Sequence, residues 1–380
     1  MILTNGLVIL PNEIRDDLDV ILRDGKVAEL RPHRRAGEAI DLRGNYLAPG
    51  LIDLHVHGAL GRDSMEGSAD ALRAICDYHA RGGTTSLLIT TATAELERIC
   101  STLALVRTCR SQIPQIAGAH VEGPFLSADK AGAQDTRFIC EPTVQRTDQL
   151  LEYRDVIKRI TIAPEIRGAL DSIERFHSAG ISVSGGHSDA WDEDAGTAFE
   201  HGMTSVTHVF NCMSSARKRG VGRVAGLLEF ALSEPQMNCE LIADGHHVSS
   251  TLIKMLYRAK GTDRICLVTD ATAGAGLPDG TEFELAGRKC VISNGVCLLA
   301  DRSALAGSAA SMIDLVRNMV NKVGISLLVA IAMASRNPAR EIGLSNKGTI
   351  AAGNDADLVV ISPALEIGQT FVAGEPVYSR

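Results

Sequence analysis

Histidines and carboxylates follow several short apolar runs of this chain, and these residue types suit metal chemistry. His55 and His57 lie one residue apart at the end of the first such run. Because alternate residues of a β-strand point to the same face, both imidazoles can reach one ion. Four further residues of these types end other apolar runs: Glu122, His187, His208 and Asp270. The pattern therefore predicts a site for first-row divalent ions, with a carboxylate available to move protons.

Eight runs with strand character position these residues along the chain. They cover residues 51–57, 84–91, 115–122, 160–165, 181–187, 205–208, 239–243 and 265–270. Helical stretches lie between them, among them residues 69–81, 95–110 and 169–179. Eight strand–helix alternations predict an α/β fold of the (β/α)8 barrel type, with a doubly wound open sheet as the alternative.

The predicted barrel explains why residues far apart in the sequence can form one site. The carboxyl ends of barrel strands meet at a single mouth, where the five candidate ligands and Asp270 would converge. A lone histidine is more often a packing or surface residue. Four others are interpreted in that way because they fall in expected loops or helices: His33, His79, His177 and His201.

The two ends of the chain have a different character from the middle. Short β-runs occupy residues 1–48 and 347–380, and Asp24-Gly25 is a strong hairpin turn. Neither end has enough apolar residues for a core of its own. We therefore expect one small β-sandwich domain built from both ends, with the barrel over residues 49–346.

Composition excludes several classes of partner. The net charge of −8 and the absence of a long basic stretch argue against nucleic acid, and no apolar run is long enough to span a membrane. The first residues lack the pattern of a signal peptide. The nine cysteines form no Cys-x-x-Cys pair and fit reduced packing residues, so a cytoplasmic protein is expected.

Six segments together resemble a known family. Residues 49–58 (PGLIDLHVHG) are similar to the signature of the amidohydrolase superfamily. Five further segments narrow the resemblance to the N-acetylglucosamine-6-phosphate deacetylases: residues 120–125 (HVEGPF), 186–188 (GHS), 207–211 (THVFN), 243–248 (ADGHHV) and 267–271 (LVTDA). The resemblance follows the same order over nearly the whole chain.

The resemblance implies the roles of the candidate ligands. Glu122, His187 and His208 would hold the principal metal ion. His55 and His57 would hold a second ion with Glu122 as the bridge, because the fourth strand has no lysine to carboxylate. One or two ions per chain are expected, with zinc favoured over iron, cobalt or manganese. Asp270 would pass a proton from the attacking water to the departing amine.

The resemblance also implies a set of residues that contact the substrate, and a homodimer. The substrate residues are Ala133, Gln134, Asn211, Cys212, Arg219, His247, Leu305, Ala306 and Gly307. Arg219 would bind the phosphate. Two positions depart from the family: Gln134 stands where a histidine is usual, and residues 219–222 read Arg-Gly-Val-Gly instead of Arg-Glu-Pro-Gly.

The expected activity is hydrolysis of the acetamide of N-acetylglucosamine 6-phosphate, a small-molecule amino-sugar phosphate. Both departures fall on substrate positions, so two alternatives remain: N-acetylgalactosamine 6-phosphate and an unphosphorylated amino sugar. A catalytically silent metal-binding protein is a further alternative from another class. The retained Asp270 argues against it, because a silent relative has no need of the base.

Overall fold

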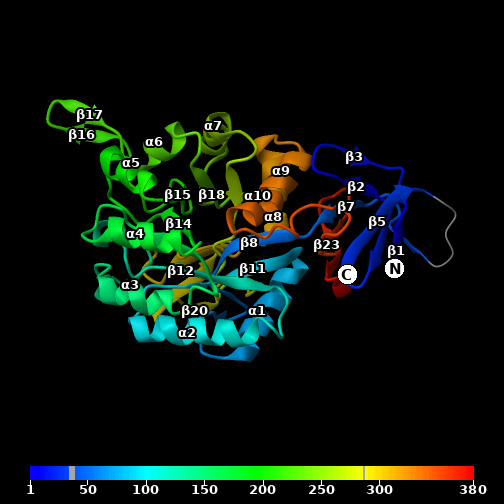
Figure 1. The fold of residues 1–380 in the computed structure, drawn as a ribbon, viewed down its shortest axis with the longest axis horizontal. Coiled ribbons are helices and arrows are strands. Elements are labelled where there is room, and N and C mark those ends of the chain that lie inside the picture. Colours follow the sequence, from blue (N-terminus) through cyan, green and yellow to red (C-terminus); the bar gives the residue numbers. More distant parts are fainter. Residues whose placement is uncertain (34–38, 286) are drawn as a thin grey trace.

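The computed structural model describes residues 1–33, 39–285 and 287–380, and its centre is a parallel barrel (Figure 1). The eight strands run in the order β19-β18-β15-β14-β13-β12-β11-β8. Their bounds are β8 (Leu51–Val56), β11 (Thr84–Thr91), β12 (Ile116–Glu122), β13 (Ile157–Ile162), β14 (Ser182–Gly185), β15 (Met203–Val206), β18 (Asn238–Leu241) and β19 (Ile265–Leu267). Every predicted barrel strand is present, and the open-sheet alternative is wrong.

The last gap of the barrel closes just beyond β19. Val56 forms a parallel bridge with Ala271. Beside it the fully buried Asp53 accepts a 2.6 Å hydrogen bond from the hydroxyl of Thr269. Burial raises the pKa of Asp53 to about 7, although hydrogen bonds from Thr269 and from the backbone N–H of His55 oppose the rise. The first and last strands are thereby joined directly below the mouth.

Helices cover the outside of the barrel (Figure 1). Their bounds are α1 (Ala69–Arg81), α2 (Leu96–Cys109), α3 (Val144–Leu151), α4 (Ala169–Ser178), α5 (Asp192–Glu200), α6 (Leu227–Ser233), α7 (Ser250–Lys260), α8 (Met312–Asn318), α9 (Leu327–Ala334) and α10 (Arg336–Glu341). Two short 3-10 helices, η1 (Ala128–Lys130) and η2 (Thr136–Phe138), and one π-helix, η3 (Met319–Val323), complete the set. Helix α1 shows the local cause: Ser68 caps its start, and Leu72, Ile75 and His79 bury one face. The buried His79 confirms a packing role for that histidine. Among the described residues, no helix has the length and apolar character to cross a membrane.

The two ends of the chain share one small β-structure beside the barrel, where both termini lie (Figure 1). One sheet has the order β25-β24-β23-β7-β2-β3 and the other β5-β4-β1-β6. Their bounds are β1 (Ile2–Thr4), β2 (Leu7–Ile9), β3 (Ile14–Arg15), β4 (Leu18–Arg23), β5 (Lys26–Pro32), β6 (Ile40–Asp41), β7 (Tyr46–Pro49), β23 (Leu358–Ile361), β24 (Ile367–Val372) and β25 (Glu375–Ser379). β7 and β23 are antiparallel, with Ala48 opposite Val359. The predicted sandwich of both ends fits this arrangement, and the domain limits at residues 48/49 and 346/347 stay a prediction.

Three small antiparallel pieces were not predicted. The largest is the sheet β20 (Glu282–Leu285), β21 (Arg288–Ser293) and β22 (Val296–Leu299), which has its own apolar cluster around Phe283 and Ile292. The others are the pair β9 (Gly58–Ala59) and β10 (Arg62–Asp63) and the hairpin β16 (Arg217–Arg219) and β17 (Gly222–Val224). The three-stranded sheet matters most for the site, because Leu285 reaches the mouth of the barrel.

Candidate metal centre and active site

A cavity of about 210 Å³ lies at the carboxyl ends of the barrel strands. Most of the predicted site residues line it: His57, Glu122, Ala133, Gln134, His187, His208, Asn211, Cys212, His247, Asp270, Leu305 and Gly307. Three predicted residues do not line it: His55, Ala306 and Arg219. A larger hollow of about 700 Å³ opens at the other end of the barrel and contains none of the candidate ligands.

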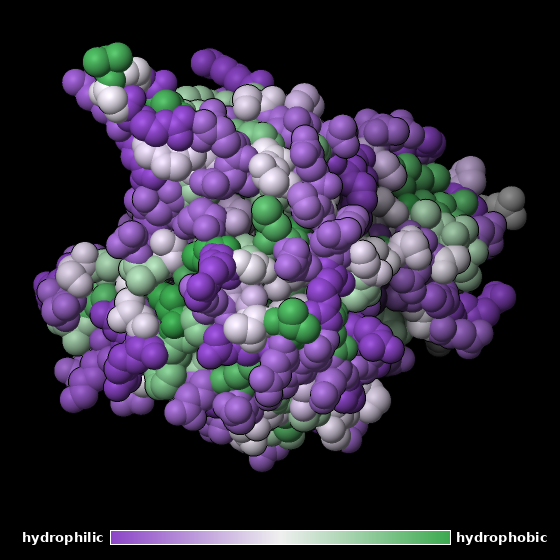
Figure 2. Space-filling model, turned by 60° about the vertical axis from the view of Figure 1, so that its left-hand side comes forward, coloured by the Kyte–Doolittle hydropathy of each residue, from purple (hydrophilic) through white to green (hydrophobic). Residues whose placement is uncertain are grey.

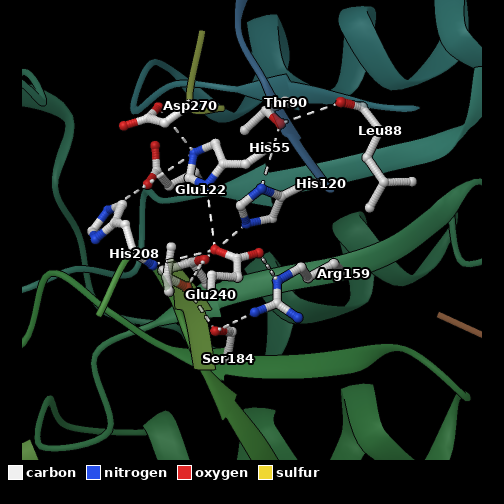
Figure 3. Close-up of polar contacts among 12 residues, drawn as sticks. His55, Leu88, Thr90, His120, Glu122, Arg159, Ser184, His208, Glu240 and Asp270 are labelled. Atoms are coloured by element: carbon white, nitrogen blue, oxygen red, sulfur yellow. Dashed lines mark hydrogen bonds and ion pairs between the residues drawn. The ribbon is translucent and has the colours of Figure 1, made fainter. Parts of the chain in front are cut away.

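The first ligand group is His55, His57 and Glu122. His55 and His57 are buried, and their Nε2 atoms lie 3.1 Å apart, as the alternation of β8 predicts. The Nε2 atom of His57 lies 3.1 Å from Glu122 Oε2, and that of His55 lies 3.4 Å from Oε1. His55 does not line the cavity, and its Nε2 is directed toward Glu122 and Asp270 (Figure 3).

The second ligand group is Glu122, His187 and His208. Both imidazoles place Nε2 at 3.2 Å from Glu122 Oε1, and their two Nε2 atoms are 3.1 Å apart. His187 Nδ1 faces the carbonyl of Lys130 at 2.9 Å, and His208 Nδ1 faces that of Asn211 at 3.2 Å. A carbonyl can only accept, so each Nδ1 carries the hydrogen and each Nε2 presents a lone pair.

Two lone pairs that face each other at 3.1 Å repel unless a cation lies between them. This geometry fits a divalent ion held by Glu122, His187 and His208, and the first group offers the same donor types. Glu122 is shared by the two groups: its Oε1 lies 3.2 Å from the Nε2 atoms of His187 and His208, and its Oε2 lies 3.1 Å from that of His57. Its carboxylate is therefore placed to bridge two ions.

Backbone conformation turns three of these side chains into the mouth. His187, His208 and Asp270 have φ values of 46°, 30° and 50°, in the left-handed region that residues other than glycine rarely adopt. Each follows the last hydrogen-bonded residues of its strand. Strain of this kind concentrates at functional sites, because the surrounding structure has to maintain it.

Asp270 occupies the position expected of an acid–base group. Its Oδ1 lies 3.4 Å from His55 Nε2 and 3.5 Å from His57 Nε2, and its side chain is 14% exposed at the cavity. The carboxylate therefore lies beside the first ligand group and remains accessible to a substrate. The backbone of Gly307 packs against the carbonyl of Asp270, where a Cβ atom would come within 2.5 Å.

The side chain of Gln134 contacts the carboxylate of Glu122, which belongs to both ligand groups. Its Nε2 donates to Glu122 Oε2 at 2.6 Å, and its Oε1 accepts from the backbone N–H of Thr93 at 2.7 Å. Both ends of the amide are therefore engaged. Sequence reasoning assigned Gln134 to the substrate alone and did not find this contact.

His247 is held by an acidic neighbour that was not singled out. Asp244 Oδ2 lies 2.7 Å from His247 Nδ1, and its other oxygen accepts the backbone N–H groups of His246 and His247. Burial lowers the pKa of His247, but the Asp244 carboxylate outweighs this effect and raises it. Asp244 thus favours the protonated form of His247 at the wall of the cavity.

The remaining predicted substrate residues differ in how they meet the cavity. Asn211 uses its side-chain amide to donate to the carbonyls of His208 and Val209. Cys212 and Leu305 line the wall. The buried Ala306 does not line it: its carbonyl accepts a hydrogen bond from Thr272, and its N–H donates to the carbonyl of Cys297.

Arg219 does not line the cavity of its own chain. It belongs to the β16–β17 hairpin, which projects from the body of the molecule in Figures 1 and 2. Its guanidinium pairs with Glu193 and lies 4.9 Å above the ring of Trp191. The hairpin turns at the fully exposed Val221, so the spacing from Asn211 gave the residue but not its direction.

Charged residues inside the barrel were also missed. Arg159 of β13 and Glu240 of β18 are both essentially unexposed, directly below the ligands (Figure 3). Burial alone would favour a neutral Glu240, but Arg159 and His55 keep its pKa below the usual range. Their one available signal was a charge in the middle of an apolar strand.

Comparisons with known proteins agree with this geometry. The family model of the amidohydrolase family matches residues 46–377. N-acetylglucosamine-6-phosphate deacetylase of Lysinibacillus sphaericus is 34% identical over 98% of this chain and 97% of its own. N-acetylgalactosamine-6-phosphate deacetylase of Escherichia coli O157:H7 is 33% identical over 95% and 94%.

Solved structures give the same result. The crystal structure of N-acetylglucosamine-6-phosphate deacetylase from Pasteurella multocida superposes with a TM-score of 0.94 at 31% identity, covering 100% of this chain and 99% of that one. An alanine variant of the Mycobacterium smegmatis enzyme, in complex with N-acetyl-D-glucosamine-6-phosphate, gives 0.93 at 29% identity, with coverage of 100% and 99%. The chain belongs to the amidohydrolase family and is an amide-hydrolysing enzyme.

Proposed function

We propose that the enzyme hydrolyses the acetamide of N-acetylglucosamine 6-phosphate to glucosamine 6-phosphate and acetate. The observation that carries the proposal is the convergence of two ligand groups and Asp270 on one cavity of about 210 Å³. The names of the relatives, which span the whole chain, support the same substrate.

The donor set supports a centre of two divalent ions. Glu122, His187 and His208 would hold one, and His55 and His57 would share Glu122 to hold the other. A bound ion supplies an acidified water and polarises the acetyl carbonyl. We propose zinc, with iron, cobalt and manganese as the alternatives that imidazole and carboxylate ligands also accept.

The chain's own groups then complete the hydrolysis. Asp270 accepts a proton from the attacking water and delivers it to the nitrogen of the amine that leaves. Gln134 holds Glu122 in place through its 2.6 Å hydrogen bond, so the shared carboxylate keeps both oxygens toward the ligand groups. His247, whose protonated form is favoured by Asp244, suits the phosphate of the substrate.

A second substrate, N-acetylgalactosamine 6-phosphate, has support of its own. Two relatives named for that activity are 33% and 32% identical to the chain. Gln134 also departs from the histidine usual at its position. The two sugars differ only at carbon 4, so the same centre can serve either one.

Acetate release across four sugars tests the proposal. The panel is N-acetylglucosamine and N-acetylgalactosamine, each with and without the 6-phosphate, and the measure is kcat/KM. The expected result is the highest value for N-acetylglucosamine 6-phosphate. A higher value for the galactose isomer would transfer the assignment to it. No release from any sugar by metal-loaded enzyme would refute the activity and favour the silent metal-binding alternative.

We also propose a homodimer and a cytoplasmic location. The nine unpaired cysteines support the location, because thiols persist in a reducing compartment. Light scattering coupled to size-exclusion chromatography measures the mass of the assembly, and a monomeric mass would contradict the dimer.

A further inference from the structure

A chain of charged side chains crosses the inside of the barrel below the metal centre. Arg159 lies between two carboxylates, with Nε at 2.9 Å from Glu240 Oε1 and a terminal nitrogen at 2.9 Å from Glu341 Oε1. Its other terminal nitrogen donates to the hydroxyls of Ser184 and Ser205 at 2.8 Å. The interior of such barrels is usually filled with branched apolar residues, so this charged interior is unusual.

Burial makes this arrangement costly. The side chains of Arg159, Glu240 and Glu341 are 0%, 1% and 4% exposed. A buried ion pair commonly contributes less to stability than apolar residues of the same volume would. Stability alone therefore does not explain why the charges are there, and their contacts indicate a role for them.

Glu240 is the member of this charged row nearest the metal centre, and it contacts one ligand from each ligand group (Figure 3). Glu240 Oε2 lies 3.4 Å from His55 Nδ1 and accepts the backbone N–H of His208 at 3.3 Å. The nearest other imidazole, His120, packs edge-on against His55 and is occupied by Thr161 at 2.8 Å. Glu240 is thus the described group that faces Nδ1 of His55.

We propose that Glu240 is the positioning residue of the second ion site, with Arg159 holding its carboxylate in place. A carboxylate can only accept, so it keeps the hydrogen of His55 on Nδ1 and leaves the Nε2 lone pair toward Glu122 and Asp270. The proposal rests on the metal centre proposed above. Partners of this kind orient a ligand and increase its basicity, and their loss typically costs about 10- to 100-fold in metal affinity.

An isosteric amide separates this role from simple packing. In Glu240→Gln, the NH₂ group must face either the Arg159 guanidinium or the N–H of His208, and both are donors. Facing His208 it also confronts His55 Nδ1 with a donor. The imidazole then accepts at Nδ1 and carries its hydrogen on Nε2, where the ligand lone pair is needed.

The chain offers a matched control at the other end of the same arginine. Glu341 is also buried, also pairs with Arg159, and accepts the hydroxyl of Ser182 at 2.7 Å. It borders the 700 Å³ hollow and contacts no candidate ligand. Glu341→Gln therefore makes the same change of charge beside Arg159 without touching His55.

The test is zinc binding by chelator-treated enzyme. Competition with a chromophoric chelator measures the affinity for each ion, and elemental analysis measures the number of ions per chain. We expect two ions in the wild type. Glu240→Gln should keep the ion of Glu122, His187 and His208. It should bind the second ion, that of His55 and His57, about 10- to 100-fold less tightly. Glu341→Gln should keep both affinities, although the melting temperature of its metal-free form falls as that of Glu240→Gln does.

Two results would overturn the proposal alone: an unchanged second affinity in Glu240→Gln, or an equal loss in Glu341→Gln. A wild type that holds one ion would overturn the two-ion centre together with this inference. If Glu240→Gln does not fold, Glu240→Asp replaces it. The shorter carboxylate keeps its charge for Arg159 but withdraws from His55, so the same loss at the second ion is expected and its absence refutes the role.

Discussion

Replacement of Asp270 by asparagine tests the assignment of the acid–base group most directly. The two side chains have the same shape, and asparagine tolerates the left-handed conformation that residue 270 adopts at φ 50°. The backbone carbonyl of residue 270 still accepts from Ser308 at 2.8 Å. We therefore expect the variant to fold and to melt close to the wild type.

The expected loss is in turnover. The carboxylate Oδ1 lies 3.4 and 3.5 Å from the Nε2 atoms of His55 and His57, which places it within reach of a water bound beside them. General acid–base catalysis contributes about 10²- to 10⁴-fold, which corresponds to about 2.7 to 5.4 kcal/mol at 1.36 kcal/mol per tenfold. The side-chain amide of asparagine at position 270 cannot accept the proton of the water, so kcat should fall by about 10²- to 10⁴-fold.

Steady-state kinetics with N-acetylglucosamine 6-phosphate, run beside elemental analysis and thermal melting, separates the causes. A kcat within a few-fold of wild type, with metal still bound, would refute the role. A large loss of the ion held by His55, His57 and Glu122 would instead assign Asp270 to metal binding.

Four further predictions concern the site and its neighbours, and Arg219→Ala accompanies the third of them. His187→Asn and His208→Asn should each abolish the principal ion and the activity; full metal content with normal turnover in either variant would contradict the ligand assignment. The double variant His55→Gln, His57→Asn should hold one ion per chain instead of two, as measured by elemental analysis. An unchanged metal content would show that these residues are not ligands. His247→Gln should lower kcat/KM about 10- to 100-fold for the phosphorylated sugar, since hydrogen bonds to charged groups contribute about 1.5–3 kcal/mol, and should spare the unphosphorylated one. Arg219→Ala, made in parallel, tests the phosphate role expected of this residue: a loss selective for the phosphorylated sugar supports it, and unchanged kinetics with both sugars contradict it. The Asp244 carboxylate raises the pKa of His247, and His247 in turn lowers the pKa of Asp244. The ion pair therefore stabilises the fold at pH values between the pKa of Asp244 and that of His247. That contribution is lost as His247 deprotonates at higher pH and as Asp244 is protonated at lower pH, and a melting curve of Asp244→Asn that keeps the wild-type pH dependence would refute it.

Periodicity and strand ends were enough to predict the barrel and most of its site. His55 and His57 could be paired from their spacing of two, because a strand repeats its faces with that period. Glu122, His187, His208 and Asp270 could be grouped because parallel strands in a barrel end at one mouth. These inferences use local geometry and one rule of topology, and both are visible in a single sequence.

Contacts across the barrel were beyond that reasoning. Glu240 faces an imidazole that lies 185 positions earlier in the chain, and nothing in the run around it names that partner. Gln134 could be aligned with a substrate residue, but its hydrogen bond to Glu122 depends on how a loop folds over the mouth. Arg219 could be aligned with a phosphate residue, but sequence spacing does not give the direction of the hairpin that carries it.

The sheet that joins both ends of the chain has a consequence for synthesis on the ribosome. β7 lies between β2 and β23, so one of its edges has no partner until β23 has been made. That strand follows roughly 300 residues later, which takes on the order of 15 to 60 s at 5–20 residues per second. During this interval the edge of the buried Leu47 and Ala48 is open to pairing with other chains. Loss of the last strands by a premature stop would leave that edge permanently exposed, so a short truncation at the end of the chain endangers what was made first.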